Sequence, residues 1–259
     1  MDRLGTARWT LPFRVLRAPI SIHVGWLLVA VLIAWTMAMK SLPAVYSGLS
    51  GQTYWMMAAV VIAGLGLSIL AHAFVHALAA RAMGITVERV TLFVFGGVTE
   101  LRETPRSVLS ELGLATVGPL ISVVLSGLIA FAAGASDLGG ASDLVVGSLT
   151  FIATLNLIMA VFNLLPAFPL DGGRALRSLM WLITGDLHRA TRIATGVAVA
   201  LSVLLMVSGI VQAARGALEG GLWTMLIGIF LQHAARAAQF DADARQILAT
   251  HRLGVPRAS

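Results

Sequence analysis

The sequence contains no cysteine and few charged residues. The absence of cysteine from all 259 residues excludes disulfide frameworks, thiolate metal sites and thiol nucleophiles. Charged residues make up 12% of the chain, about half of the roughly 25% that soluble domains carry. Hydrophobic residues make up 58%, and the mean hydropathy is +0.89. This composition excludes intrinsic disorder and indicates a membrane protein.

Long stretches without any Asp, Glu, Lys or Arg divide the chain into segments. A membrane-spanning helix needs roughly 20 apolar residues. Five of the six stretches have 22 residues or more, and the sixth has 16. We therefore expect an all-α polytopic membrane protein with about six transmembrane helices, five or seven being the alternatives. The stretches are residues 18–39, 41–80, 112–136, 144–170, 193–214 and 220–235.

The positive charges indicate how these segments cross the membrane. Sixteen of the 18 Lys and Arg residues fall on one side of the predicted membrane, and only Lys40 and Arg215 fall on the other. Cytoplasmic loops carry the excess of Lys and Arg, so we expect a multi-pass protein of the plasma membrane with both termini in the cytoplasm. The formal charge of +6 reflects this topology, and we expect no nucleic-acid partner. The many arginines and alanines favour a bacterial source.

Two stretches have the composition of strands rather than helices. Residues 10–23 and 86–99 are rich in Val, Thr, Ile and Phe, alternate in part and contain Gly or Pro breaks. Both are expected at the cytoplasmic face, where a small sheet could be shielded by protein.

Two histidines lie near the end of the second hydrophobic stretch. His72 and His76 are four residues apart, so on a helix both imidazoles project from one face and could bind one metal ion. Ionisable groups inside a membrane span are costly and are candidates for function. The alternative is a pair of histidines that only pack between helices.

A single carboxylate follows the fourth hydrophobic stretch. Asp171 lies after Pro166 and Pro169 and before two glycines, in a tightly turned segment. It could instead serve as the N-cap of the following helix. The predicted topology brings His72, His76 and Asp171 to a similar depth near the cytoplasmic leaflet. Three N or O ligands with an open fourth position are typical of a catalytic zinc site.

Four motifs together resemble the site-2 proteases, the intramembrane zinc metalloproteases. The segment HAFVH matches both histidines of that family's HExxH helix, and NLLPAFPLDGGR matches its second motif. VTLFVFGGVTEL resembles its membrane-associated strand and loop, and ATVGPLIS resembles the Gly-Pro stretch of its third helix. The resemblance covers roughly residues 10–235 and is strongest to the compact six-helix branch, which often carries a pair of regulatory CBS domains afterwards.

The resemblance implies roles for particular residues. His72, His76 and Asp171 would bind one catalytic Zn²⁺, and Asn163 would position the substrate or stabilise the oxyanion. The substrate would be a single-span membrane protein or peptide within the lipid bilayer. Residues 1–238 would form the transmembrane metalloprotease domain. Residues 239–259 would be a cytoplasmic tail or a truncated linker to a missing regulatory domain.

One position departs from the family pattern. The residue after the first histidine should be the glutamate that acts as general base, and here it is Ala73. No Asp or Glu lies between Lys40 and Glu88, so no carboxylate near in sequence can replace it. We therefore expect zinc binding with very weak cleavage or none, since loss of a general base typically costs roughly 10²–10⁴-fold. An engineered substitution is the favoured explanation, because the other motif residues are intact, and a natural pseudoenzyme is the alternative.

The second strand-like stretch suggests how substrate could bind. A helix must unwind locally before a peptide bond within it can be hydrolysed. An extended strand could then hold the unwound segment edge to edge. Phe95, Gly96 and Gly97 are the candidate substrate-binding residues here, with the glycines allowing close backbone approach. The alternative is that this stretch only seals the cytoplasmic side.

The sequence is also compatible with two other functions. A proteolytically dead membrane adaptor could keep the same motifs in order to bind partners. A metal transporter could use His72, His76 and Asp171 as ligands along a path. A transporter is the weaker alternative, because the first, third, fifth and sixth hydrophobic stretches have no acidic residue in their cores.

Overall fold

The computed structural model describes residues 8–15, 18–93, 96–101, 105 and 107–254. The chain divides into two compact units, which are described separately. The first comprises residues 1–104 and 117–162, and the second comprises residues 105–116 and 163–259.

The first unit contains a bundle of long apolar helices. Helix α1 (Val24–Thr36), a π-helical turn η1 (Met37–Ser41) and the short α2 (Leu42–Val45) follow one another directly. Helices α3 (Gly51–Ala82), α4 (Val108–Leu138) and α5 (Asp143–Asn163) complete the bundle, with α4 belonging to this unit from residue 117 onward. Its buried core gathers side chains from α2, α3 and α5, including Leu42, Met57, Val61 and Ile152.

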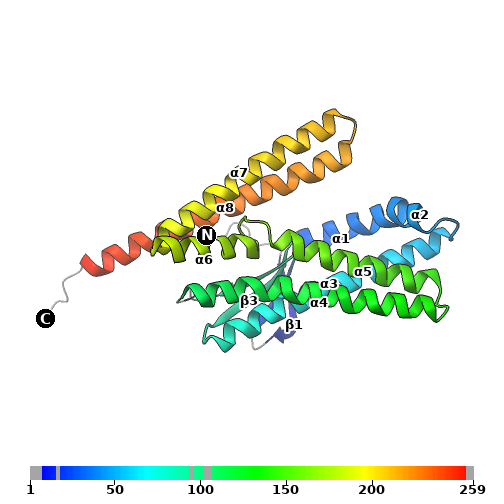
Figure 1. Cartoon of the computed structure of the whole chain (residues 1–259), viewed down its shortest axis with the longest axis horizontal. Coiled ribbons are helices and arrows are strands. Elements are labelled where there is room, and N and C mark those ends of the chain that lie inside the picture. The colour runs from blue at the N-terminus through cyan, green and yellow to red at the C-terminus, as the bar shows by residue number, and fades with distance from the viewer. Residues whose placement is uncertain (1–7, 16–17, 94–95, 102–104, 106, 255–259) are drawn as a thin grey trace. The chain divides into compact units, whose positions relative to one another are not determined.

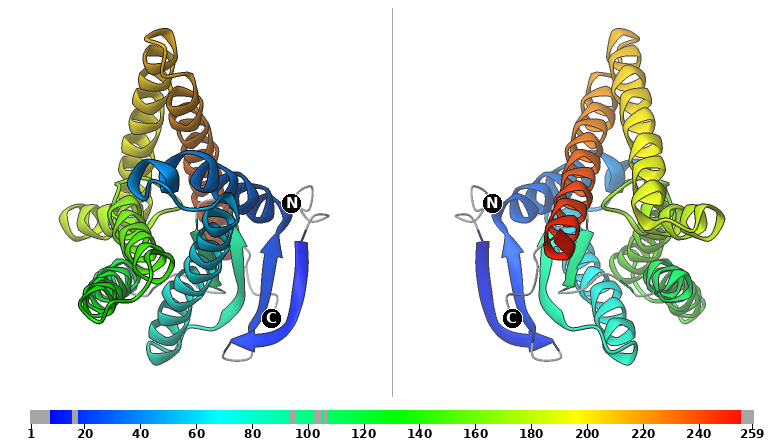
Figure 2. Two further views of the ribbon diagram at one scale, coloured as in Figure 1. Left: turned by 90° about the vertical axis from the view of Figure 1, so that its right-hand side faces the viewer. Right: turned by 90° about the vertical axis from the view of Figure 1, so that its left-hand side faces the viewer.

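A four-stranded sheet forms the other part of the first unit. Its strands are β1 (Arg8–Val15), β2 (Ala18–His23), β3 (Val87–Phe93) and β4 (Gly96–Leu101), and they lie side by side in that order (Figure 2). β1 and β2 are antiparallel, β2 and β3 are parallel, and β3 and β4 are antiparallel. The strands predicted at 10–23 and 86–99 are confirmed, and each stretch forms a hairpin rather than one strand.

The second unit is built around a long helical hairpin. Helix α6 (Asp171–Thr184) contacts α7 (Leu187–Ala214), and α8 (Leu218–Gly254) runs back along α7 (Figure 1). Glycines allow the close approach of the last two helices: a Cβ on Gly209 would lie 2.6 Å from the carbonyl oxygen of Gly221. Farther along, the Thr195 hydroxyl donates to Gln239 Oε1 at 2.8 Å. Residues 221–239 of α8 therefore lie beside residues 195–209 of α7.

Five helical segments in the described part of the chain are long and apolar enough to cross a membrane. They are Trp26–Val45, Gly51–Ala82, Val108–Leu138, Asp143–Asn163 and Leu187–Ala214. The sixth expected span lies in α8, where the stretch without charged residues is only residues 220–235. The polytopic, mainly helical fold is confirmed. Five segments of the described residues, rather than six, are long and apolar enough to cross a membrane.

Candidate metal centre

The two histidines lie on one face of α3, as their spacing predicts. His72 and His76 are both buried, and their Nε2 atoms are 3.2 Å apart. The ring centroids are 4.9 Å apart, with the planes inclined at 57°. Each imidazole therefore presents the same nitrogen to a shared point, which is the arrangement that two ligands of one metal ion require.

Helix α4 lies against this histidine pair. A Cβ on Gly118 would meet the Nε2 atoms of both histidines, and it would lie 2.6 Å from His72 Cε1. One turn later, the Ser122 hydroxyl lies 3.0 Å from His72 Nδ1. Only a residue without a side chain at position 118 leaves open the space in front of the two nitrogens.

Polar side chains link helices α3, α4 and α5 to one another. Asn156 on α5 is fully buried and donates from Nδ2 to Ser68 Oγ at 2.9 Å, one turn before His72. Ser126 on α4 donates to the Ala153 carbonyl of α5 at 2.8 Å. Helices α3, α4 and α5 are thus linked in pairs by side chains. Such hydrogen bonds contribute about 0.6–2 kcal/mol each within membranes.

These supporting residues were missed by the sequence analysis. Asn156 could have been found, because it is an amide within an otherwise apolar stretch. Ser68 and Ser122 gave no comparable indication, since serine is common in membrane helices and often bonds to its own helix.

The second unit contains Asp171, which is the first residue of α6 and is buried. The N-cap residue is Leu170, which makes no side-chain capping bond. The alternative role of Asp171 as N-cap is therefore not supported. Its carboxylate lies in the first turn, where the helix dipole stabilises negative charge.

The loop before α6 folds closely over the start of that helix. A Cβ on Gly172 would meet the backbone carbonyls of Leu164 and Leu165, and a Cβ on Gly173 would lie 2.6 Å from the Ala167 carbonyl carbon. The two glycines after Asp171 are thus required by this close packing. Asn163, at the end of α5, begins the loop and is partly buried.

A buried ion pair fixes α6 to the beginning of α4 within the same unit. Arg177 donates from both Nε and Nη2 to Glu111 Oε1, the Nε bond being 2.7 Å long, and Glu111 is only 1% exposed. The Arg177 guanidinium also lies 5.3 Å from the centre of the Phe168 ring in the loop. The Ser178 hydroxyl donates to the Val108 carbonyl at 2.8 Å.

Arg174 lies one turn after Asp171 on α6. Burial lowers the pKa of its guanidinium, whereas the nearby carboxylates of Asp171 and Glu111 raise that pKa. An arginine nonetheless stays protonated in proteins. The first turns of α6 therefore contain a carboxylate and a cation close together.

Gly96 and Gly97, two of the predicted substrate-binding residues, begin strand β4. They pair with Phe93 and Leu92 of β3. β4 is the last strand in the sheet order and contacts α3, the helix that carries the histidines. Phe95 lies outside the described residues.

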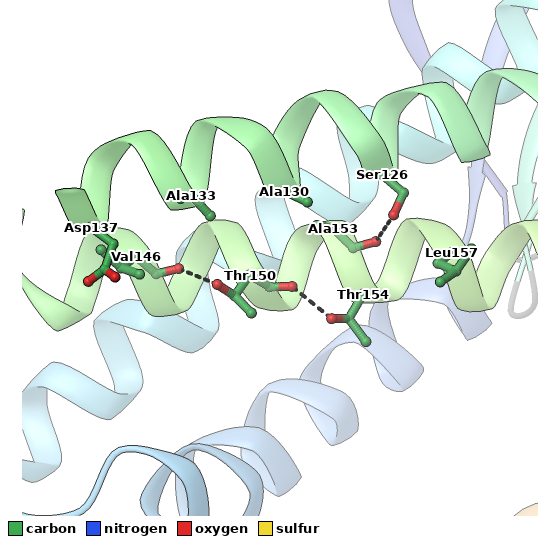
Figure 3. A pocket seen from close by; sticks show the side chains of 10 residues that line it. Ser126, Ala130, Ala133, Asp137, Val146, Thr150, Ala153, Thr154 and Leu157 are labelled. Atoms are coloured by element: carbon green, nitrogen blue, oxygen red, sulfur yellow. Dashed lines mark hydrogen bonds between the residues drawn. The ribbon is translucent and has the colours of Figure 1, made fainter. Parts of the chain in front are cut away.

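A separate hollow of about 430 Å³ lies between α4 and α5 (Figure 3). Small and hydroxyl-bearing side chains line it, and the hydroxyls of Thr150 and Thr154 donate to carbonyls of their own helix. None of its lining residues is a histidine, so it is distinct from the histidine pair. The lining residues are Ser126, Ala130, Ala133, Gly134, Asp137, Val146, Thr150, Ala153, Thr154 and Leu157.

Comparisons with known proteins agree with the resemblance drawn from the motifs. The model of peptidase family M50 matches residues 60–138 and 139–207. Rip3 of Mycobacterium tuberculosis, which is named as a zinc metalloprotease, is 35% identical over 232 residues, covering 89% of this chain and 58% of the relative. A similarly named protein of Synechocystis, sll0528, is 32% identical over 228 residues, covering 88% of this chain and 59% of the relative.

A solved structure shares the fold. The site-2 protease from Methanocaldococcus jannaschii matches with a TM-score of 0.63 and 24% identity, covering 90% of this chain and 95% of that one. The chain spans less than two thirds of the length of the curated relatives it matches. Because the family model covers more than half of the chain, the protein belongs to peptidase family M50, the family of the site-2 proteases.

Proposed function

We propose that this chain is the membrane-embedded part of an intramembrane zinc metalloprotease. It would hydrolyse peptide bonds in or near the transmembrane segments of membrane-tethered proteins. The observation that carries the proposal is the convergence of His72 Nε2 and His76 Nε2, 3.2 Å apart, in front of the side-chain-free backbone at Gly118. Family membership supports the same assignment.

The residues present fit a zinc ion. Two neutral imidazole nitrogens and one carboxylate form a donor set typical of catalytic zinc, and we assign His72, His76 and Asp171 as the three ligands. The absence of a side chain at Gly118 leaves a small space that could hold an ion and that any Cβ would fill. When bound, zinc lowers the pKa of water and polarises a carbonyl group.

The remaining site residues would act on the peptide. Asn163 is eight residues before Asp171 and offers an amide to position the substrate or stabilise the oxyanion. β4, the last strand in the sheet order, would pair through Gly96 and Gly97 with an unwound segment of the substrate. A strand that pairs on one side offers unpaired backbone groups on the other.

We infer that this form of the protein cleaves very poorly or not at all. Ala73 is fully buried beside His72 on α3 and has no group that could accept a proton. Without a general base, the rate should fall by roughly 10²–10⁴-fold. The zinc ligands do not depend on this residue, so metal binding should persist.

We also propose that the protein is a multi-pass protein of the bacterial plasma membrane with both termini in the cytoplasm. The positive charges support this orientation, as does the return of α8 along α7. Two helices packed over the same length cross the same depth, so α8 would form the sixth span despite its short charge-free stretch. The greater length of the curated relatives is compatible with a C-terminal regulatory domain.

Restoring the missing carboxylate tests the proposed activity. The chain, Ala73→Glu and Ala73→Gln are reconstituted in liposomes, loaded with zinc and given a labelled single-span peptide. We expect Ala73→Glu to cleave at least about 10²-fold faster than the chain itself. Ala73→Gln matches the glutamate in size but cannot act as a base, so it should stay at the low rate. A folded, zinc-loaded Ala73→Glu protein that remains inert would refute the protease assignment.

The same liposomes separate the two alternative functions. A metal transporter would move zinc across the bilayer, whereas a protease would hold one ion without flux. A dead adaptor would retain a membrane partner in a pull-down while Ala73→Glu stayed inactive.

A further inference from the structure

Ser122 lies where it can control the chemical form of a predicted zinc ligand. Its hydroxyl is fully buried and lies 3.0 Å from Nδ1 of His72, which is itself only 3% exposed. Both residues belong to the first unit, on α4 and α3 respectively. The contact is thus a buried hydrogen bond between two helices of one compact unit.

The Ser122 hydroxyl has one proton and can donate one hydrogen bond at a time. Ser122 Oγ donates to the Gly118 carbonyl, 3.2 Å away and one turn earlier on α4. When this proton stays on the Gly118 carbonyl, the oxygen faces His72 with its lone pairs, and the Nδ1–H tautomer of His72 can donate to it.

The tautomer decides what the opposite nitrogen can do. A neutral imidazole with its proton on Nδ1 has a free lone pair on Nε2, and only such a nitrogen can bind a metal. His72 Nε2 is the atom that faces His76 Nε2 at 3.2 Å. Gly118 and Ser122 lie one turn apart on α4: Gly118 leaves the space in front of Nε2, and Ser122 contacts the opposite ring nitrogen of His72.

We propose that Ser122 is a positioning residue that holds His72 as the Nδ1–H tautomer, with Nε2 ready for zinc. This inference rests on the proposed function, because it takes His72 to be a zinc ligand. Groups that orient metal-binding histidines in this way typically change metal affinity by roughly 10–100-fold when they are removed.

The first test needs neither metal nor activity. Long-range proton–nitrogen NMR spectra of the zinc-free chain, labelled with ¹⁵N-histidine, report which ring nitrogen carries the proton. The His72 resonances are assigned with the variant His72→Gln. We expect His72 to carry its proton on Nδ1 in the unmodified chain and to lose that preference in Ser122→Ala. An unmodified chain with the proton on Nε2 would overturn the inference, whether or not any variant folds.

The second test measures zinc affinity by competition with a chelator. Ser122→Ala should bind zinc roughly 10–100-fold more weakly than the chain, and Ser122→Thr, which keeps the hydroxyl, should recover most of the loss. Ser126→Ala is the matched control, because Ser126 also lies on α4 and donates to a backbone carbonyl, that of Ala153. Its loss should leave both the tautomer and the affinity unchanged.

The outcomes separate this inference from the proposed function. If Ser122→Ala and Ser126→Ala weaken zinc binding equally, Ser122 is only a packing residue and the inference fails. If the chain binds zinc and Ser122→Ala binds it equally well, the inference fails while the zinc site stands. If the unmodified chain binds no zinc, the proposed function itself fails.

Discussion

A histidine pair four residues apart becomes informative only when its surroundings are known. The spacing predicts that His72 and His76 share a face of a helix, and the structure confirms this arrangement. The spacing does not predict that Gly118 lies opposite both nitrogens. That contact joins residues more than 40 positions apart and depends on how α4 packs against α3.

Gly118→Ala should therefore weaken metal binding. Its methyl group would occupy the space in front of both Nε2 atoms, so we expect zinc affinity to fall by at least about tenfold while the helical content stays unchanged. The measurement is zinc competition with a chelator, accompanied by circular dichroism.

Gly127→Ala provides the control for this prediction. It lies on the same helix, and an added Cβ there would meet nothing within 4 Å. Replacing glycine by alanine within a helix should be neutral or favourable by up to about 1 kcal/mol. Equal zinc affinity in Gly118→Ala and in the unmodified chain would contradict the described position of α4.

At the scale of elements, α6 depends on a buried charge pair. Arg177 and Glu111 join the middle of α6 to the beginning of α4, and the guanidinium also lies over the Phe168 ring of the preceding loop. Removing one partner of a buried pair leaves the other charge uncompensated, which typically costs about 3–5 kcal/mol.

Arg177→Met should accordingly lower the stability of the second unit by roughly that amount. The double variant Arg177→Met with Glu111→Leu should recover much of the loss, because it leaves no uncompensated charge. Denaturation in mixed micelles, followed by tryptophan fluorescence, provides the measurement. Arg189→Met is the control, since Arg189 is 76% exposed and 3.8 Å from its partner Asp186. A double variant no more stable than Arg177→Met would contradict this interpretation of the pair.

The elements show what the sequence could and could not predict. The long apolar helices and the strand-like composition of residues 10–23 and 86–99 follow from local patterns, and the structure confirms both. The parallel pairing of β2 with β3 could not be predicted, because it joins segments about 70 residues apart. The loop over Gly172 and Gly173 was recognisable as a turn, but its contact with the start of α6 required the tertiary structure.

Some residues of the candidate site could likewise be predicted from the sequence, and others could not. The residue types and order of His72, His76 and Asp171 gave the zinc hypothesis, since few polar groups lie at membrane depth. Ser122 and Asn156 could not be assigned roles, because their importance comes from the helices they face. Supporting residues of this kind are defined by packing rather than by a local pattern.

At the scale of the whole molecule, the proposed topology makes α8 the sixth membrane span. The absence of cysteine allows single cysteines to be introduced without any background. We expect Ala217→Cys, in the turn between α7 and α8, to react with an impermeant reagent from outside intact cells. Asp241→Cys, farther along α8, should react only after the cytoplasmic side is opened, because six spans return the chain to the cytoplasm.

Labelling of both cysteines from outside would contradict the six-span topology and would place α8 on the outer surface. Ser142→Cys, in the turn between α4 and α5, provides a control that should be labelled from outside in either case.

The zinc content of the purified chain tests the central claim most directly. Measured by elemental analysis after equilibration with zinc and removal of free metal, it should be one ion per chain, despite Ala73. The variants His72→Ala, His76→Ala and Asp171→Ala should each lose that ion, whereas His233→Ala should retain it. Zinc that is absent from the unmodified chain, or that is retained in all three ligand variants, would contradict the account.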